Sequence, residues 1–459
     1  MRDLIESLRR GNWKSLLACF VYFDTGFTAW VMFGALAPFI SKQIALSPLD
    51  SAFLVAVPVL AAAIVRVSLG NLFQFVDGRR LALLGIALSA VPSCVLLVPS
   101  MPSYLSLLFL GTFLGVAGAS FAVALPLAGS SYPARIQGLV LGLAAAGNIG
   151  AVLDGFVFPG LAERFGWQHA TAAVLPLLAS AAAAVYGWAD DRSAKSEGAP
   201  RQFGGFALAF ATLIALVLLV GSHAFGTGSS GALLLPVMGS VAALAVLPRK
   251  YLAVLGDRDT WVVMLIYSIT FGGFVGMSSY VTLLLTTQYG ISKVGAGLVM
   301  GALSFTGAMV RPLGGLIADR ISGVKALLAL LFGIACCNFA FAALMPSLVG
   351  GVVLLAALYL CFGLGNGATF QLVPHRWRGK TGLMTGIVGA AGGIGGFYLP
   401  VIFGIARADT GSYQLGFATF GILAALALAL VLGLQRQWLT WALPQEPGEA
   451  SRVSVVPAD

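Results

Sequence analysis

Long apolar stretches recur along the whole chain and alternate with short polar segments. Each stretch has at least 18 mainly apolar residues, which is long enough for a helix to cross about 30 Å of hydrocarbon. Lipid offers no partners for backbone groups, so such stretches form helices whose hydrogen bonds are satisfied internally. The pattern predicts an all-α integral membrane protein with fourteen transmembrane helices, at about 15–40, 50–75, 80–99, 103–127, 136–160, 170–189, 204–222, 231–248, 260–287, 294–317, 324–345, 348–374, 380–405 and 414–435.

The polar segment ADDRSAKSEGAPR (189–201) divides these helices into a first group of six, an extra pair and a last group of six. The extra pair is rich in Ala, Leu and Val and has no charged residue within its apolar part. We expect it to be peripheral and to face lipid, and we assign it no function. The expected domains are an N-terminal bundle, a cytoplasmic linker with the extra pair, a C-terminal bundle and a cytoplasmic tail: 1–189, 190–259, 260–435 and 436–459.

The composition supports the same class and excludes others. Of the 459 residues, 59% are hydrophobic and only 9% are charged, whereas a soluble globular protein has about 25% charged residues. No basic stripe with interleaved aromatic residues lies outside the predicted membrane loops, so the net charge of +9 does not indicate a nucleic-acid-binding protein. No Cys/His pair has metal spacing and no catalytic dyad is visible, so we expect neither a cofactor nor an enzyme.

The basic residues predict a topology. With the N-terminus in the cytoplasm, twenty of the 26 lysines and arginines lie inside, as the positive-inside rule requires. The other six comprise four on the outside and two within the membrane: Lys42, Arg164, Lys293 and Arg407, and then Arg66 and Arg311. We therefore expect a multi-pass protein of the bacterial inner membrane with both termini in the cytoplasm.

An internal repeat relates the two groups of six helices. GASFAVALP (118–126) with GLVLGLAAAGNIG (138–150) behind it resembles GATFQLVP (367–374) followed by GLMTGIVGAAGGIGG (382–396). Two parallel six-helix repeats resemble the major facilitator fold, in which substrate lies near the midplane between the halves. The glycines let helices approach closely, which leaves a narrow path suited to an ion of few atoms.

A loop motif also occurs twice, after the second helix of each half. FQFVDGRR (73–80) and GGLIADRISGVK (314–325) both resemble the G-x-x-x-D-R-x-G-R-R motif of the major facilitator superfamily. The resemblance implies cytoplasmic charge clamps that break as the halves rock, and solvated loops are the alternative. The clamp residues are Asp77, Arg79, Arg80, Asp319 and Arg320.

Four charged side chains lie within the apolar spans: Asp24, Arg66, Asp154 and Arg311. Placing Arg or Asp at a helix centre costs about 2.5–3.5 kcal/mol, so each needs a partner or a function. Arg66 and Arg311 occupy second helices of the two halves, and the repeat therefore places them on opposite walls of one cavity. Two guanidinium forks favour a small oxyanion between them. Neutralisation of each arginine by Asp24 or Asp154 is the alternative.

At two long segments the sequence resembles a particular branch of that superfamily. Residues 115–150 and 363–400 are similar to the two nitrate signatures of the nitrate/nitrite porter family. The resemblance implies a nitrate or nitrite ion between Arg66 and Arg311. It also implies that the rings of Phe121 and Phe271 sandwich the anion. Asn148 and Tyr267 are the two further substrate contacts that it implies. Without it, the two phenylalanines would be interpreted as core aromatics and Asn148 as an interhelical hydrogen-bonding residue.

These observations predict secondary active transport by alternating access, in which anion binding neutralises the repulsion between the arginines and lets the halves close. The expected partners are nitrate, nitrite, protons and the lipid bilayer, for a carrier that works as a monomer. Both proton symport and nitrate/nitrite antiport remain open, and a carrier of another small anion is the alternative. Asp24 is the best candidate for a proton carrier, with a permanent counter-ion or packing role as the alternative. Asp154 departs from the small residue expected there. Three interpretations stay open: a partner of an arginine, a residue that takes part in proton transfer, or an idiosyncrasy of this sequence.

Overall fold

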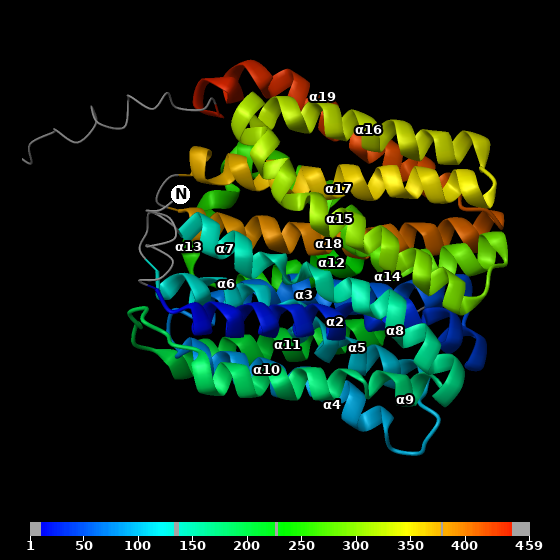
Figure 1. Ribbon diagram of the computed structural model, residues 1–459, viewed down its shortest axis with the longest axis horizontal. Coiled ribbons are helices and arrows are strands. Elements are labelled where there is room, and N and C mark those ends of the chain that lie inside the picture. The colour runs from blue at the N-terminus through cyan, green and yellow to red at the C-terminus, as the bar shows by residue number, and fades with distance from the viewer. Residues whose placement is uncertain (1–10, 133–136, 225–227, 378–379, 443–459) are drawn as a thin grey trace, which may run out of the picture.

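The computed structural model describes residues 11–132, 137–224, 228–377 and 380–442, and every regular element in these ranges is helical. Figure 1 shows long helices lying side by side, with connections at the end that carries the N-terminus and at the opposite end. The N-terminal half contains α2 (Trp13–Gln43), α3 (Pro48–Leu72), α4 (Gly78–Leu96), α5 (Tyr104–Gly118), α6 (Phe121–Ser130), α7 (Gln137–Ala145), the 3-10 turn η2 (Ala146–Ile149), α8 (Gly150–Phe165), α9 (Trp167–Thr171) and α10 (Val174–Trp188).

The middle segment and the C-terminal half follow. They contain α11 (Ala199–Gly221), α12 (Gly228–Val246), α13 (Arg249–Leu255), α14 (Arg258–Tyr289), α15 (Lys293–Ile321), α16 (Gly323–Leu344), α17 (Leu348–Arg376), α18 (Thr381–Thr410) and α19 (Gln414–Ala442). The predicted tail from residue 443 onward lies outside the described residues, as do Arg135 and Arg378 of the two nitrate signatures.

Helix ends follow the local sequence. The side chain of Ser47 accepts from the Asp50 amide before Pro48 starts α3, and Asp77 caps α4 in the same way. These side chains satisfy amides that lack partners in a first helical turn. Gly290 and Gly411 end α14 and α18 with φ of 64° and 67°, a region that glycine adopts without steric cost.

Thirteen helical segments are long and apolar enough to cross a membrane, and α12 adds a shorter apolar helix over Ser229–Ala245. The fold class is thus confirmed as all-helical and membrane-spanning, while the count of fourteen spans stays a prediction. Two predicted helices are not continuous: 103–127 is divided into α5 and α6, and 136–160 into α7, η2 and α8. Each region still contains one candidate membrane span, Tyr104–Ser130 and Leu143–Phe165.

The second interruption has a physical cause in close packing. A Cβ on Gly147 would lie 2.9 Å from the backbone nitrogen of Asp24, and one on Gly150 would overlap the Asp24 carbonyl. Small residues let η2 press directly on α2, and the helix tightens to a 3-10 turn at this contact. The interruption therefore sits beside Asn148 and Asp24, two of the predicted functional residues.

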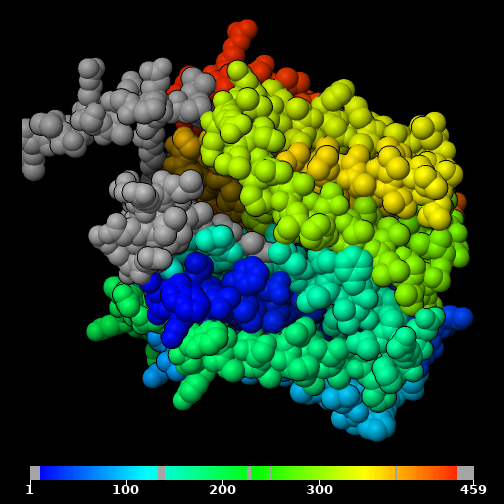
Figure 2. Space-filling model, viewed as in Figure 1, coloured from blue at the N-terminus to red at the C-terminus, as the bar shows by residue number. Residues whose placement is uncertain are grey.

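The two halves meet most closely at the end opposite the termini. A Cβ on Gly155 of α8 would overlap the backbone of Gly297 and Gly301 of α15. Figure 2 shows the cyan and green atoms of the N-terminal half meeting the yellow-green atoms of the C-terminal half across the visible face. A second seam joins α3 to α18, where a Cβ on Gly393 would lie 2.7 Å from the Cβ of Ala63.

Nearer the termini α18 has fewer such contacts. Among the described residues, no atom outside the local backbone of α18 lies within 4 Å of the Cβ position of Gly382 or Gly386. The halves are thus packed together at one end and separated along this part of α18 at the other.

The extra pair lies at the periphery, as expected, but it also covers a seam between the halves (Figure 1). A Cβ on Gly239 of α12 would overlap Ile64 of α3, and Tyr398 of α18 donates to the Leu233 carbonyl at 2.9 Å. Leu213, Val217 and Leu235 of the pair are buried, while its outer face carries exposed side chains such as Val241, which is 62% exposed. The pair is therefore anchored to both halves.

Candidate functional site

Arg66 lies in the last third of α3, and its side chain is held by backbone carbonyls. It is only 2% exposed, and its Nη1 and Nη2 donate to the carbonyls of Gly389 and Gly118, each at 2.9 Å. Gly389 belongs to the C-terminal half and Gly118 to the N-terminal half. Among the described residues Arg66 forms no ion pair, so the alternative of neutralisation by Asp24 or Asp154 is not realised at Arg66 in this structure.

Aromatic rings surround the same guanidinium. Its carbon lies 5.2 Å from the ring centroid of Phe121, 5.7 Å from Trp30 and 5.8 Å from Phe271. Ring faces attract a cation, and the attraction grows in a desolvated site. Phe121 and Phe271 thus both lie at Arg66, together with Trp30, which sequence reasoning did not single out.

Arg311 of α15 has a less complete set of partners. Its Nη1 is buried and has no hydrogen-bond partner, and its guanidinium lies 5.9 Å from the ring of Phe370. The Tyr267 hydroxyl interacts with Arg311, and the two arginines are close enough to affect each other electrostatically. A buried donor on a cation without a partner is costly, and it is available to an anion.

The repeat explains why Phe370 lies there. Phe121 in GASF and Phe370 in GATF hold the same repeat position, and each lies over the arginine of its own half. The repeat was visible in the sequence, so Phe370 was within reach of sequence reasoning. The predicted pair Phe121 and Phe271 is not the symmetric pair.

A compact aromatic group joins the two arginines. Tyr267 stacks on Phe271 with centroids 5.0 Å apart and planes at 5°, and it meets Phe370 edge-on at 4.9 Å. A Cβ on Gly392 of α18 would lie 2.6 Å from Tyr267 and 2.8 Å from Phe271. The glycine-rich face of α18 therefore makes room for this stack.

Two buried asparagines complete the polar groups near this level. Asn148 on η2 is 3% exposed and Asn366 on α17 is 2% exposed, and the Oδ1 atom of each has no partner. Asn366 precedes Phe370 by one helical turn. Buried amides normally satisfy their hydrogen bonds, so these two are further candidates for contacts with a polar substrate.

Asp24 and Asp154 form a second polar group, between α2 and α8. Asp154 is fully buried and neither carboxyl oxygen has a partner, while Oδ1 of Asp24 is also buried and unpaired. The two carboxyl groups interact electrostatically with each other. Thr28 is bonded to the carbonyls of Asp24 and Gly150. Within the described residues Asp154 forms no ion pair, so the alternative of pairing with an arginine is not realised in this structure.

The predicted clamp residues lie at the end that carries the termini. Asp77 accepts from the Arg80 amide, and the Arg79 guanidinium lies 4.7 Å from the ring of Tyr186. Asp319 and Arg320 are exposed. Within the described residues none of the five forms an ion pair.

The linker is bound to the first of these loops. Asp191 accepts from the Gly78 amide at 2.7 Å and pairs with Lys195 at 2.6 Å, and Lys195 donates to the Phe73 carbonyl. Burial alone would raise the pKa of Asp191, but the hydrogen bonds from Lys195, Ser193 and Gly78 outweigh it and lower that pKa. The segment predicted as a plain polar linker is thus attached to the start of α4.

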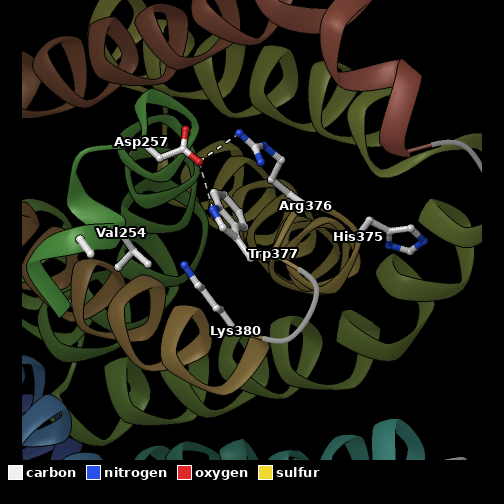
Figure 3. A pocket seen from close by; sticks show the side chains of 7 residues that line it. Val254, Asp257, His375, Arg376, Trp377 and Lys380 are labelled. Carbon is white, nitrogen blue, oxygen red and sulfur yellow. Dashed lines mark hydrogen bonds and ion pairs between the residues drawn. The ribbon is translucent and has the colours of Figure 1, made fainter. Parts of the chain in front are cut away.

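A cavity of about 440 Å³ lies between α13 and the junction of α17 with α18 (Figure 3). Asp257 pairs with Arg376 at 3.0 Å and accepts from Trp377, while the Lys380 side chain points into the same space and His375 points away. Arg376 also binds Asp259 at 2.7 Å. This network ties α14 to α17 and is separate from the Arg66–Arg311 site.

Comparison with known proteins agrees with the helical arrangement. The profile described as Major Facilitator Superfamily matches residues 18–380. This chain belongs to the major facilitator superfamily. It is therefore a transporter and not an enzyme.

The curated relatives are named after nitrate and nitrite. The chain is 31% identical to the probable nitrate/nitrite transporter NarK2 of Mycobacterium tuberculosis, over 94% of this chain and 95% of the relative. It is 28% identical to the nitrite extrusion protein of Bacillus subtilis, over 91% of each chain. It is also 28% identical to the probable nitrate transporter NarT of Staphylococcus epidermidis, over 90% of this chain and 94% of the relative. The resemblance to the nitrate/nitrite porter family is confirmed.

Proposed function

We propose that this protein carries nitrate and nitrite across the bacterial inner membrane by alternating access, with one anion bound between Arg66 and Arg311. The observation that supports this most directly is the buried, unpaired Nη1 of Arg311 next to a second buried arginine. Guanidinium forks match the planar oxygens of a small oxyanion. The proposal takes a monomer as the working unit.

The aromatic group favours a flat anion of few atoms. The Tyr267–Phe271 stack and the edge of Phe370 line the space between the arginines. The two guanidinium groups can offset the desolvation of one small planar anion, whereas a sugar would need many more polar partners. The names of the relatives agree with nitrate and nitrite as the substrates.

The conformation supports a transport cycle. The halves are packed at the end opposite the termini and separated along α18 near Gly382 and Gly386. With the termini in the cytoplasm, this is an inward-facing state. The clamp residues would pair in the opposite state, in line with the lack of ion pairs among them here.

The Arg66 bond to Gly389 crosses the seam between the halves. It lets a backbone carbonyl of the C-terminal half balance the arginine after the anion has left. The unloaded carrier must break the Arg66–Gly389 hydrogen bond before it can reorient to the outward-facing state. An anion that takes the place of the Gly389 carbonyl at Arg66 therefore speeds this reorientation.

Asp24 and Asp154 provide a route for proton coupling. Import of nitrate against an inside-negative potential requires co-transport of more than one proton. The Asp154 carboxyl is buried with both oxygens unpaired and interacts electrostatically with the Asp24 carboxyl. In an apolar span the two cannot both be charged at low cost, so at least one carries a proton. Asp24 packs against the turn that bears Asn148, which links proton binding to the anion site. We therefore favour proton symport.

Uptake of labelled nitrate into proteoliposomes tests the anion site. Arg66→Lys and Arg311→Lys should both abolish high-affinity uptake, because an ammonium keeps the charge but loses the bidentate fork. The exposed Arg436 of α19, replaced by Lys, is the matched control and should keep uptake near that of the wild type. High-affinity uptake by both site variants would disprove binding between two guanidinium forks.

The same vesicles distinguish the coupling modes. An imposed proton gradient should drive nitrate accumulation, and Asp24→Asn or Asp154→Asn should abolish that drive while leaving nitrate/nitrite exchange. Accumulation that responds only to internal nitrite would show antiport and would contradict the proposed role of the two carboxyl groups.

A further inference from the structure

A second cavity, of about 390 Å³, lies at the end of the molecule opposite the termini. We call it the outer vestibule. It is bounded by the ends of α2 and α3 from the N-terminal half, and of α14, α15 and α18 from the C-terminal half. It therefore lies over the line where the two halves meet.

The outer vestibule is strongly cationic. Its lining residues include Lys42, Lys293 and Arg407, and no acidic residue is found among the described lining residues. The expected topology places only four basic residues at this end of the chain, and Arg164 is the fourth. Three of the four thus converge on one cavity although they come from three distant helices.

The lysines remain available for an incoming anion. Lys42 and Lys293 are close enough to repel each other electrostatically, and Glu163 of α8 is the acidic group that acts on Lys293. Within the described residues neither lysine forms an ion pair. Nζ of Lys293 lies 4.3 Å from the ring of Phe39, which positions the ammonium without neutralising it.

The remaining polar lining also leaves donors free. Nη1 of Arg407 donates a hydrogen bond to the Gly411 carbonyl, and the guanidinium carbon lies 5.4 Å from the ring centroid of Tyr413. The other guanidinium N–H groups of Arg407 are therefore available to a ligand. The hydroxyl of Ser41 is buried without a hydrogen-bond partner. Small anions bind where such donors and positive charge occur together.

The outer vestibule is separate from the Arg66–Arg311 site. Beneath it, Thr282 of α14 donates to the Gly34 carbonyl of α2 at 2.5 Å, and Gly404 of α18 packs on Ala52 of α3. Ser51 in the lining and Arg66 are fifteen residues apart on α3, which corresponds to roughly 22 Å along a helix. The closed contacts therefore divide the two sites.

We propose that the outer vestibule is a collection site for small monovalent oxyanions, which concentrates nitrate above the closed contacts before the central site opens to that side. This inference rests on the proposed function and adds a second, weaker binding site to it. Like charges lining a cleft raise the local concentration of an oppositely charged ligand, and the effect falls with ionic strength. Because the outer vestibule is exposed to water, it binds the anion only weakly, and the anion can pass on to the Arg66–Arg311 site.

Kinetics in cells whose own nitrate carriers have been removed test the proposal. In Lys42→Gln/Lys293→Gln, the KM for external nitrate should rise about five- to tenfold at low ionic strength, with kcat within about twofold of the wild type. Added Arg407→Gln should increase the effect. The ionic-strength dependence of KM should flatten in both variants, and the KM measured from the cytoplasmic side in everted vesicles should stay unchanged.

Arg164→Gln is the matched control, because it removes a charge from the same end without touching the cavity lining. An external KM that is the same in the lysine variants as in the wild type, or equally raised in the Arg164 variant, would overturn the proposal. So would an equal change in KM on both sides of the membrane.

A measurement without transport separates this proposal from the proposed function. Nitrate should slow acylation of Lys42 and Lys293 by an impermeant amine reagent in purified, detergent-solubilised protein, relative to the exposed Lys325 at the other end. Protection by added phospholipid but not by nitrate would identify a headgroup site and overturn the inference. Protection in a protein that moves no nitrate would support the vestibule and reject the proposed function.

Discussion

Arg66 and Arg311 hold equivalent positions in the two halves, but their surroundings differ. Arg66 is bonded to carbonyls from both halves and lies among three aromatic rings. Arg311 has one aromatic ring nearby and a buried nitrogen with no partner. One arginine is therefore part of the contact between the halves in this state, and the other keeps a donor free for substrate. Symmetric sequence positions thus serve unequal roles within one conformation.

Removing the charge of Arg66 or of Arg311 should produce the largest loss of nitrate binding, and the effect on Tm should distinguish the two arginines. We expect Arg66→Met and Arg311→Met each to weaken nitrate binding by about 100-fold, since each leaves only one guanidinium for the anion. Only Arg66→Met should also lower Tm by several degrees, because it removes two charge-assisted hydrogen bonds worth about 1.5–3 kcal/mol each. Arg311→Met should keep or raise Tm. Thermal unfolding with and without nitrate measures both effects, and an equal loss of Tm would contradict unequal roles.

The seam that carries the Arg66–Gly389 bond offers the next test. Gly393→Ala would place a methyl group 2.7 Å from the Cβ of Ala63, and overpacking of this kind costs about 1–3 kcal/mol. We expect nitrate uptake to slow roughly tenfold, because the halves can no longer close fully on that side. Gly386→Ala, with no atom within 4 Å of the new methyl, is the matched control on the same helix. Equal rates in the two variants would show that the seam does not limit transport.

The aromatic rings give a smaller, graded difference. Phe370→Ala removes the ring nearest Arg311, whereas Phe121→Ala leaves Arg66 with Trp30 and Phe271. A cation–π contact is worth about 0.5–2 kcal/mol, so we expect the KM for nitrate to rise about 3- to 30-fold in the Phe370 variant and less in the Phe121 variant.

Phe341→Leu is the control for loss of an aromatic ring, because Phe341 stacks on Phe417 between α16 and α19. Its KM should match the wild type. A larger effect of Phe121→Ala than of Phe370→Ala would reverse the comparison between the two arginines.

The smallest expected effect is a change in Tm at the loop of the N-terminal half. The loop of the N-terminal half is attached to the linker through Asp191, whose lowered pKa means that folding favours its charged form. That stabilisation is complete above the ordinary aspartate pKa of about 3.9 and is lost as pH falls through the lowered value. Asp191→Asn should lower Tm by about 1–2 °C at pH 7, and the gap should close at acid pH. A gap that does not begin to narrow as pH falls below about 3.9 would contradict the assignment.

Much of the fold was predictable because hydrophobic length alone identifies spans. The interruption at Asn148 was not, since GNIG differs little from an ordinary glycine-rich helix and only contact with α2 tightens it. Likewise, GASF and GATF already paired Phe121 with Phe370, whereas nothing in the sequence places Trp30 beside Arg66. Aromatic residues within apolar spans carry no local signal of what they face.

The sequence by itself determined the class of protein, the duplicated halves, the two membrane arginines and the family, because length, charge and repeated motifs are properties of the chain. The tertiary structure decided which groups balance each charge. It assigned backbone carbonyls to Arg66, left Arg311 with a free donor, and placed Asp154 beside Asp24. Partners of buried charges come from helices distant in sequence, so only packing in three dimensions selects them.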